Sequence, residues 1–213
     1  MFYLEIKYIR SSIAAGDYST TFLFTLQRNR RRLERTSQSR QHFVKAATLF
    51  NEAQKTKDQN EAESLAEQAI VEVDDAIRLD KDDPSFHILK SLALEIVGNS
   101  KGAVKELDRA LKSPRTLTVP ERSVTMVKKA ELLLSQPEDG ENQIQEAVAD
   151  LRRSVELTPR NVRAKLLLGK AYEKDGNIPK AIETFNAAAT LDPNSPDAKE
   201  ALERLHASSP IAT

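Results

Sequence analysis

The 213-residue sequence contains no cysteine and no tryptophan, and it has only six glycines and nine prolines. The absence of cysteine excludes a disulfide framework, a thiolate metal site and a cysteine nucleophile. Sparse glycine and proline do not suit a fold with many tight turns, whereas charged residues make up 30% of the chain. Long helices with large polar surfaces fit this composition. The sequence therefore predicts an all-α protein with enough apolar material for a sizeable core.

A long hydrophobic run is also missing. The N-terminal residues 1–18 alternate loosely between apolar and polar, but Glu5, Lys7 and Arg10 interrupt them. A transmembrane helix needs roughly 20 predominantly apolar residues, and a secretory signal needs an uninterrupted apolar segment. We therefore expect no transmembrane segment, and a secretory signal fits poorly.

Two interpretations of the N-terminal extension, residues 1–39, stay open. Ser, Thr and Arg with few acids are typical of an organelle transit peptide, which would occupy residues 1–35. Glu5, Asp17 and Glu34 argue against it. The alternative is a solvated extension, partly disordered, whose later part continues as a helix into Phe43. We favour the second interpretation and expect a cytoplasmic protein.

Positive charge is concentrated at this end of the chain. The first 45 residues hold nine Lys and Arg against three Asp and Glu, whereas the remainder is acidic. The run of Arg28, Arg30, Arg31 and Arg32 could contact phosphate backbones. It has no interleaved aromatic residues and no accompanying nucleic-acid-binding motif. We interpret it as a solvated charge cluster and do not expect a nucleic-acid partner.

Residues that would support catalysis or metal binding do not form a recognisable set. His42, His87 and His206 lie far apart in the sequence, with no paired histidine or spaced carboxylates beside them. Adjacent acids such as Asp74 and Asp75 are typical of solvated helix surfaces. Neither a phosphate-binding glycine loop nor a serine-nucleophile motif is present. We expect no catalytic residues, no metal, no cofactor and no small-molecule substrate.

What the sequence does contain is an internal repeat. Small and aromatic residues recur at a period of about 34 residues. The unit that begins at Val162 shows the pattern most completely, in Leu168, Gly169, Tyr172, Gly176, Ala181, Phe185, Ala188 and Pro193. This pattern resembles the tetratricopeptide repeat (TPR), with Lys165 at the position of the signature tryptophan.

The same register extends upstream, since Leu157 and Pro159 lie 34 positions before Leu191 and Pro193. The resemblance covers roughly residues 40–207. We expect longer helices in the first unit and a longer inter-helix loop around Pro137 in the third. The predicted parts are an extension 1–39, units 40–83, 84–120, 121–161 and 162–195, a capping helix 197–207 and a disordered tail 208–213.

The resemblance implies a right-handed superhelix of antiparallel helix pairs that serves as a non-catalytic protein-interaction scaffold or adaptor. Helices approach closely where side chains are small, so we expect Gly169 to face Ala181. Gly98 and Gly176 should supply left-handed turns after helix ends, and Pro84, Pro120 and Pro196 should open helices.

In TPR proteins the first helices of the units line a concave groove. Carried over by position, the candidate groove residues are Lys45, Asn51, Ile88, Leu92, Lys128, Arg163, Lys170 and Lys174. They predict an apolar middle and a basic C-terminal wall, suited to a protein or peptide partner with acidic character near the fourth unit. The alternative for Ile88, Leu92 and also Leu166 is packing against neighbouring helices.

One TPR subclass, the chaperone adaptors, grips a terminal carboxylate with Lys and Asn side chains. Here Thr48 and Leu89 stand where two of the asparagines are expected. This difference argues against a co-chaperone-type adaptor, which stays an alternative together with an adaptor targeted to an organelle or membrane by the N-terminal extension.

Overall fold

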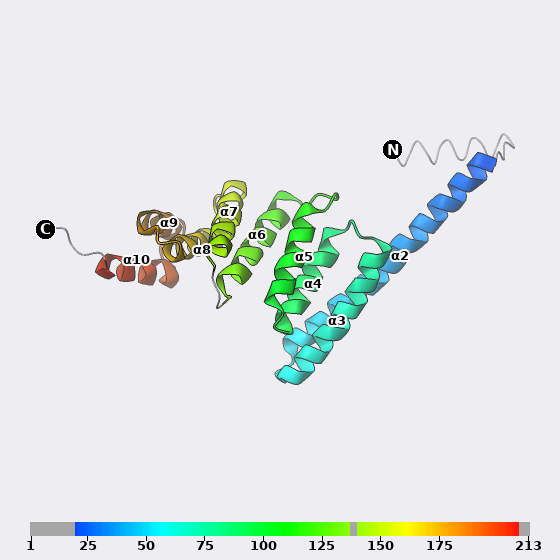
Figure 1. Cartoon of the computed structure of the whole chain (residues 1–213), viewed down its shortest axis with the longest axis horizontal. Coiled ribbons are helices and arrows are strands. Elements are labelled where there is room, and N and C mark those ends of the chain that lie inside the picture. Colours follow the sequence, from blue (N-terminus) through cyan, green and yellow to red (C-terminus); the bar gives the residue numbers. More distant parts are fainter. Residues whose placement is uncertain (1–19, 137–139, 209–213) are drawn as a thin grey trace.

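A computed structural model describes residues 20–136 and 140–208. Within these residues the chain forms nine α-helices and no strand, which confirms the predicted all-α class (Figure 1). The helices are α2 Thr20–Lys55, α3 Gln59–Leu79, α4 Pro84–Ile96, α5 Ser100–Lys112, α6 Val119–Leu134, α7 Glu141–Leu157, α8 Val162–Lys174, α9 Ile178–Leu191 and α10 Pro196–Ser208.

Helix starts follow from local capping chemistry. Side chains of Asp, Asn or Thr at the N-cap accept hydrogen bonds from the otherwise unpaired backbone N–H groups of the first turn. Thr118 and Glu121 form a reciprocal capping box at the start of α6. The other side-chain caps are Asp58, Asp83, Asn99, Asn161 and Asn177. Pro84, Pro120 and Pro196 lie in first turns, as predicted.

The two predicted glycine turns are present. Gly98 and Gly176 both have φ of 74°, in the left-handed region that L-residues with a Cβ rarely adopt. Each follows the end of a first helix, α4 or α8, and lets the chain reverse into the next helix within a few residues. The sharp reversal makes α4 and α5, and likewise α8 and α9, antiparallel neighbours.

Consecutive helices pack in pairs, α2 with α3, α4 with α5, α6 with α7 and α8 with α9, and each pair stacks on the next. The stack extends from α2 at one end to α10 at the other, as Figure 1 shows. Helix α10 packs on α9, and its Ala201 and Leu205 join the C-terminal core. It covers the apolar face of the last pair, which an open solenoid end would expose to water.

Helix α2 is much longer than its partner, with 36 residues against 21 in α3. Its N-terminal part extends past the end of α3 (Figure 1). The predicted boundary at residue 39 lies inside this helix, so the structure has no break there. Residues 1–19, 137–139 and 209–213 lie outside the described residues, and so do the sequence-based interpretations of these segments.

The apolar core is divided along the solenoid. An N-terminal cluster of buried residues joins α2, α3 and α4, and a C-terminal cluster joins α6 to α10. Between them lies a small cluster of Ala103, Leu107 and Leu132, which we call the seam. The contact between α5 and α6 therefore buries little apolar surface, and polar contacts described below supplement it.

Close packing in the last unit differs in detail from expectation. The side chain nearest to the open face of Gly169 is that of Phe185, not Ala181. A Cβ built on Gly169 would lie 2.7 Å from two carbons of that ring. Phe185 is fully buried. The glycine is therefore required to admit an aromatic ring, whereas sequence alone suggested contact between two small residues.

Candidate protein-binding groove

A hollow of about 420 Å³ lies on the side of the first helices, where α4 and α6 meet the start of α8. We call it the inner groove. It brings together four of the predicted groove residues, Ile88, Leu92, Lys128 and Arg163, which are distant in sequence. Val124 and Val127 of α6 also line it.

The floor of the inner groove is apolar and partly open to solvent. Val124 is 62% exposed, which is high for a large apolar side chain. Ile88 packs partly against the seam and Leu92 partly against the N-terminal cluster, while both line the groove. The two sequence-based alternatives, groove lining and helix packing, therefore hold together for these residues. Leu166 packs against the C-terminal cluster.

A chain of ion pairs crosses the groove from α4 to α8. Lys128 Nζ lies 2.8 Å from a carboxylate oxygen of Glu95 and 3.7 Å from Glu131. Arg163 donates two hydrogen bonds to Glu131, at 2.8 and 2.9 Å. These cations are already paired with Glu95 and Glu131, so this part of the predicted basic wall is not an open positive surface.

The other four predicted site residues lie elsewhere. Lys45 forms an ion pair with Glu72 of α3, and Asn51 is exposed on α2. Lys170 is exposed on α8. Lys174 donates a 2.7 Å hydrogen bond to the carbonyl oxygen of Leu134. None of the four lines the inner groove.

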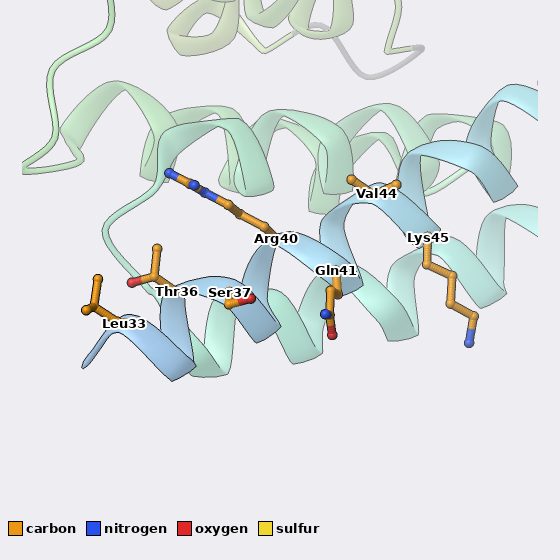
Figure 2. A pocket seen from close by; sticks show the side chains of 7 residues that line it. All are labelled: Leu33, Thr36, Ser37, Arg40, Gln41, Val44 and Lys45. Carbon is orange, nitrogen blue, oxygen red and sulfur yellow. The ribbon is translucent and has the colours of Figure 1, made fainter. Parts of the chain in front are cut away.

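Lys45 instead lines a hollow of about 550 Å³ along α2. Among the described residues, its lining comes from one face of this helix, including Leu33, Arg40 and Val44 (Figure 2). Leu33 and Val44 are 59% and 63% exposed. One helix face with two exposed apolar side chains does not specify an occupant, so it does not extend the candidate site.

Helix packing brings carboxylates next to His42, which sequence alone did not show. His42 Nδ1 lies 2.8 Å from Glu72 and 3.9 Å from Asp75, and ligand atoms of the three residues lie within 4.8 Å of one another. The sequence gives no sign of these neighbours, because Glu72 is 30 residues away from His42 in the chain. Lys45 pairs with Glu72 and Arg78 pairs with Asp75, so both negative charges are already neutralised. We therefore interpret the cluster as a structural ion-pair network.

A second histidine is buried between helices. His87 of α4 is 8% exposed, and its Nδ1 lies 2.7 Å from Glu106 of α5. Burial alone would raise the pKa of Glu106, but the contact with His87 and the charges of Lys90 and Arg109 lower it below its ordinary value. Glu106 is therefore a buried anion held by three partners.

The third charged cluster lies beside the seam. Lys129 of α6 is 4% exposed. Its Nζ lies 2.7 Å from Asp108 of α5, and 2.6 and 2.9 Å from Glu146 and Asp150 of α7. Burial disfavours its charge, but these three acids outweigh burial and raise the pKa of Lys129. Burial raises the pKa of Asp150 despite the lysine. We call these four residues the Lys129 cluster.

Comparison with known proteins identifies the type of repeat in this chain. A family model for the tetratricopeptide repeat matches residues 138–196. No curated protein sequence matches the chain. Among the helices that the structure describes, none combines the length and the hydropathy of a membrane span.

Solved structures with the same arrangement of helices include "MamA 41-end from Desulfovibrio magneticus RS-1", with 26% identity over 76% of this chain and 84% of that one, at a TM-score of 0.60. YrrB, described as a TPR protein with an unusual peptide-binding site, has 21% identity, 75% coverage of both chains and a TM-score of 0.57. The first TPR of Spaghetti (RPAP3), bound to the HSP90 peptide SRMEEVD, has 16% identity, covers 60% of this chain and 94% of that one, and has a TM-score of 0.51.

Proposed function

Because the chain is a tetratricopeptide-repeat-like protein with an all-α TPR solenoid, we propose that it is a non-catalytic scaffold that holds a segment of a partner protein in the inner groove. The observation that carries this proposal is the exposed apolar floor around Val124, enclosed by three first helices. Exposed apolar surface in a concave site is where proteins bind peptides. TPR neighbours that bind peptides support the choice of partner class.

The groove suggests a partner segment with apolar side chains flanked by charge. Apolar side chains would displace water from Val124 and Leu92, at about 25 cal/mol per Å² buried. An acidic residue of the partner would compete with Glu131 for Arg163, and a longer acidic segment would extend along α8 to Lys170, which lies outside the groove lining. Among the described residues, Lys170 has no ion-pair partner of its own. An acidic partner is thus part of the proposal.

The terminal-carboxylate clamp of chaperone adaptors fits this chain poorly. Leu89 is 7% exposed and belongs to the N-terminal core cluster, so it offers no polar group to a ligand. The hydroxyl of Thr48 donates to the carbonyl of Val44 in its own helix. We therefore favour an internal segment over a C-terminal peptide. A cytoplasmic location, with which the lack of cysteine is compatible, is also part of the proposal.

Site-specific photo-crosslinking tests the groove. A photoreactive phenylalanine analogue is placed at Val124, and in a control variant at Val71 on α3. Both valines are 62% exposed, but only Val124 lines the groove. Partners that crosslink at Val124 and not at Val71, and that are mapped to one peptide segment by mass spectrometry, would support the proposal. The same partners captured equally at both positions would contradict it.

A further inference from the structure

Two joints of the solenoid, by which we mean the contacts between consecutive helix pairs, contain the same arrangement of charges. Lys90, on the first helix of unit two, lies 2.6 Å from Asp74 on the preceding helix α3 and 3.6 Å from Glu106 on α5. Lys129, on the first helix of unit three, lies 2.7 Å from Asp108 on the preceding helix α5 and 2.9 Å from Asp150 on α7.

In each case a lysine of one unit bridges an acid of the preceding unit and an acid of its own second helix. The long side chain and its acids occupy the crevice between three helices. At the first two joints, paired charged side chains of the protein itself therefore lie where the helices meet.

The equivalent positions of unit four hold different residues. Lys90 lies eight positions before Gly98, and Leu168 lies eight positions before Gly176. The two glycines have the same φ, which fixes the register between the units. Lysine is thus replaced by leucine at the third joint.

The acid of the preceding unit is replaced as well. Asp108 follows the fully buried Ala103 by five positions, and Arg152 follows the fully buried Ala147 by five positions. Asp74 has the same relation to Ala69. At the third joint an arginine therefore stands where the other two joints have an aspartate.

This replacement coincides with an open hollow. A space of about 430 Å³ lies between α7, α8 and α9, lined by Leu168 and Arg152 among others. We call it the outer groove. It involves second helices and a different face of α8 from the inner groove, since no residue lines both.

The outer groove combines cations with an apolar floor. Leu168 and Tyr172 form part of the floor, and Arg152, Lys165 and Lys180 surround it. Lys180 Nζ lies 5.5 Å from the centre of the Tyr172 ring, a cation–π contact. In the part of the chain that the structure describes, none of the three cations has an ion-pair partner.

Two acids also line this groove, which narrows the choice of ligand. Glu156 forms an ion pair with Arg153, which does not line the groove, and Glu183 is exposed. The two carboxylates would repel the evenly spaced phosphates of a nucleic acid, whereas a single carboxylate can lie among the three cations. The volume exceeds that of a small inorganic anion, and the apolar floor favours a side chain beside the charge.

We propose that the outer groove is a second protein-binding site, which takes an acidic segment with a carboxylate among Arg152, Lys165 and Lys180 and an adjacent apolar side chain on Leu168 and Tyr172. This site is independent of the inner groove. A protein with both grooves occupied would connect two partners across the third joint.

A peptide titration tests the site. The probe is a short, acetylated, fluorescent peptide of alternating glutamate and leucine, followed by fluorescence anisotropy, with a lysine–leucine peptide of the same length as its counterpart. We expect the acidic peptide to bind and the basic one not to bind. Replacing all three cations by glutamine (R152Q, K165Q, K180Q) should weaken binding at least about tenfold. Failure of the acidic peptide to bind at about 1 mM overturns the proposal.

A control variant separates the site from the overall charge. Lys101, Lys105 and Lys112 are exposed on α5 and line neither groove, so K101Q, K105Q, K112Q makes the same change in net charge elsewhere. Binding should survive in this variant, and an equal loss in both triple variants overturns the proposal. Circular dichroism checks that both variants remain helical.

A second test introduces the lysine–aspartate arrangement of the first two joints at the third joint. The double variant R152D, L168K restores the lysine–aspartate pair and should fill the outer groove. We expect it to lose binding of the acidic peptide while crosslinking at Val124 is unchanged. If the folded double variant binds as tightly as the native protein, the assignment is wrong. Loss of crosslinking at Val124 with normal peptide binding would instead count against the inner groove alone.

Discussion

Replacing Lys129 by methionine should expose the energetic role of the Lys129 cluster. Methionine keeps most of the length and volume of lysine but removes the charge. The substitution would leave Asp108, Glu146 and Asp150 next to one another without the cation that all three contact. Uncompensated carboxylates beside a buried position are expensive, because both desolvation and mutual repulsion disfavour them.

The expected magnitude follows from burial. Removing one partner of a buried pair costs about 3–5 kcal/mol. The side chains of Asp108 and Glu146 are 33% and 46% exposed, so they can regain part of their hydration. We therefore expect the free energy of unfolding to fall by about 2–4 kcal/mol. Urea unfolding followed by far-UV circular dichroism measures it.

The neighbouring Lys128 provides a matched control. It is on the same helix, but its pair with Glu95 is more exposed, with side-chain exposures of 26% and 39%. Lys128→Met should cost no more than about 1 kcal/mol. A loss in Lys129→Met that is no larger than in Lys128→Met would refute the reasoning.

The loss of unfolding free energy in Lys129→Met, which we call the deficit, should depend on pH. The pKa of Asp150 is already raised by burial, and loss of Lys129 raises it further. A carboxyl with a raised pKa binds its proton more tightly in the native state, so acidification favours that state. The deficit of Lys129→Met should therefore shrink as pH falls from neutral toward the pKa of Asp150. A deficit that is constant or grows over that range would contradict the assignment.

Two further predictions concern packing and acid stability. Gly169→Ala should lower the free energy of unfolding by about 1–2 kcal/mol, because overpacking against Phe185 outweighs the better helix propensity of alanine; urea unfolding would measure it, and Phe185→Leu in the same chain should reduce the loss. The lowered pKa of Glu106 means that its contribution is present above its ordinary pKa of 4.5 and is lost as pH falls through the lower native value. Glu106→Gln should thus reduce stability at neutral pH and flatten the acid side of a stability profile, whereas an unchanged profile would exclude this role for the pair with His87.

The repeat positions that require one residue type could be predicted from the sequence. Gly98 and Gly176 supply a backbone conformation that few other residues adopt, and Pro84 marks a helix start through its fixed φ. These constraints are local, so the pattern of one unit is enough to recognise them. The repeat also places equivalent faces of successive first helices side by side, so Ile88 and Lys128 line the same groove.

The contacts that depend on pairs of distant residues could not be predicted. Lys90 and Lys129 replace the leucine that the repeat pattern has at Leu168, and their acids are on other helices. Without a residue-by-residue register between units, each reads as an ordinary surface charge. The ion pair between Arg163 and Glu131 could not be predicted for the same reason, since Glu131 belongs to another repeat.

The unequal joints also restrict the order in which the units can stack. A solenoid of similar helix pairs could skip a unit, or exchange units with a second chain, because every pair offers much the same apolar faces. If α4 followed α7, Lys90 would face Arg152, and two like charges would meet at a closed contact. If α8 followed α3, Asp74 would be placed against Leu168 with no cation to balance it. By this criterion only the two joints that contain a lysine could be exchanged for one another. The different residues at the third joint therefore oppose incorrect stacking and help to fix the order of the units along the array.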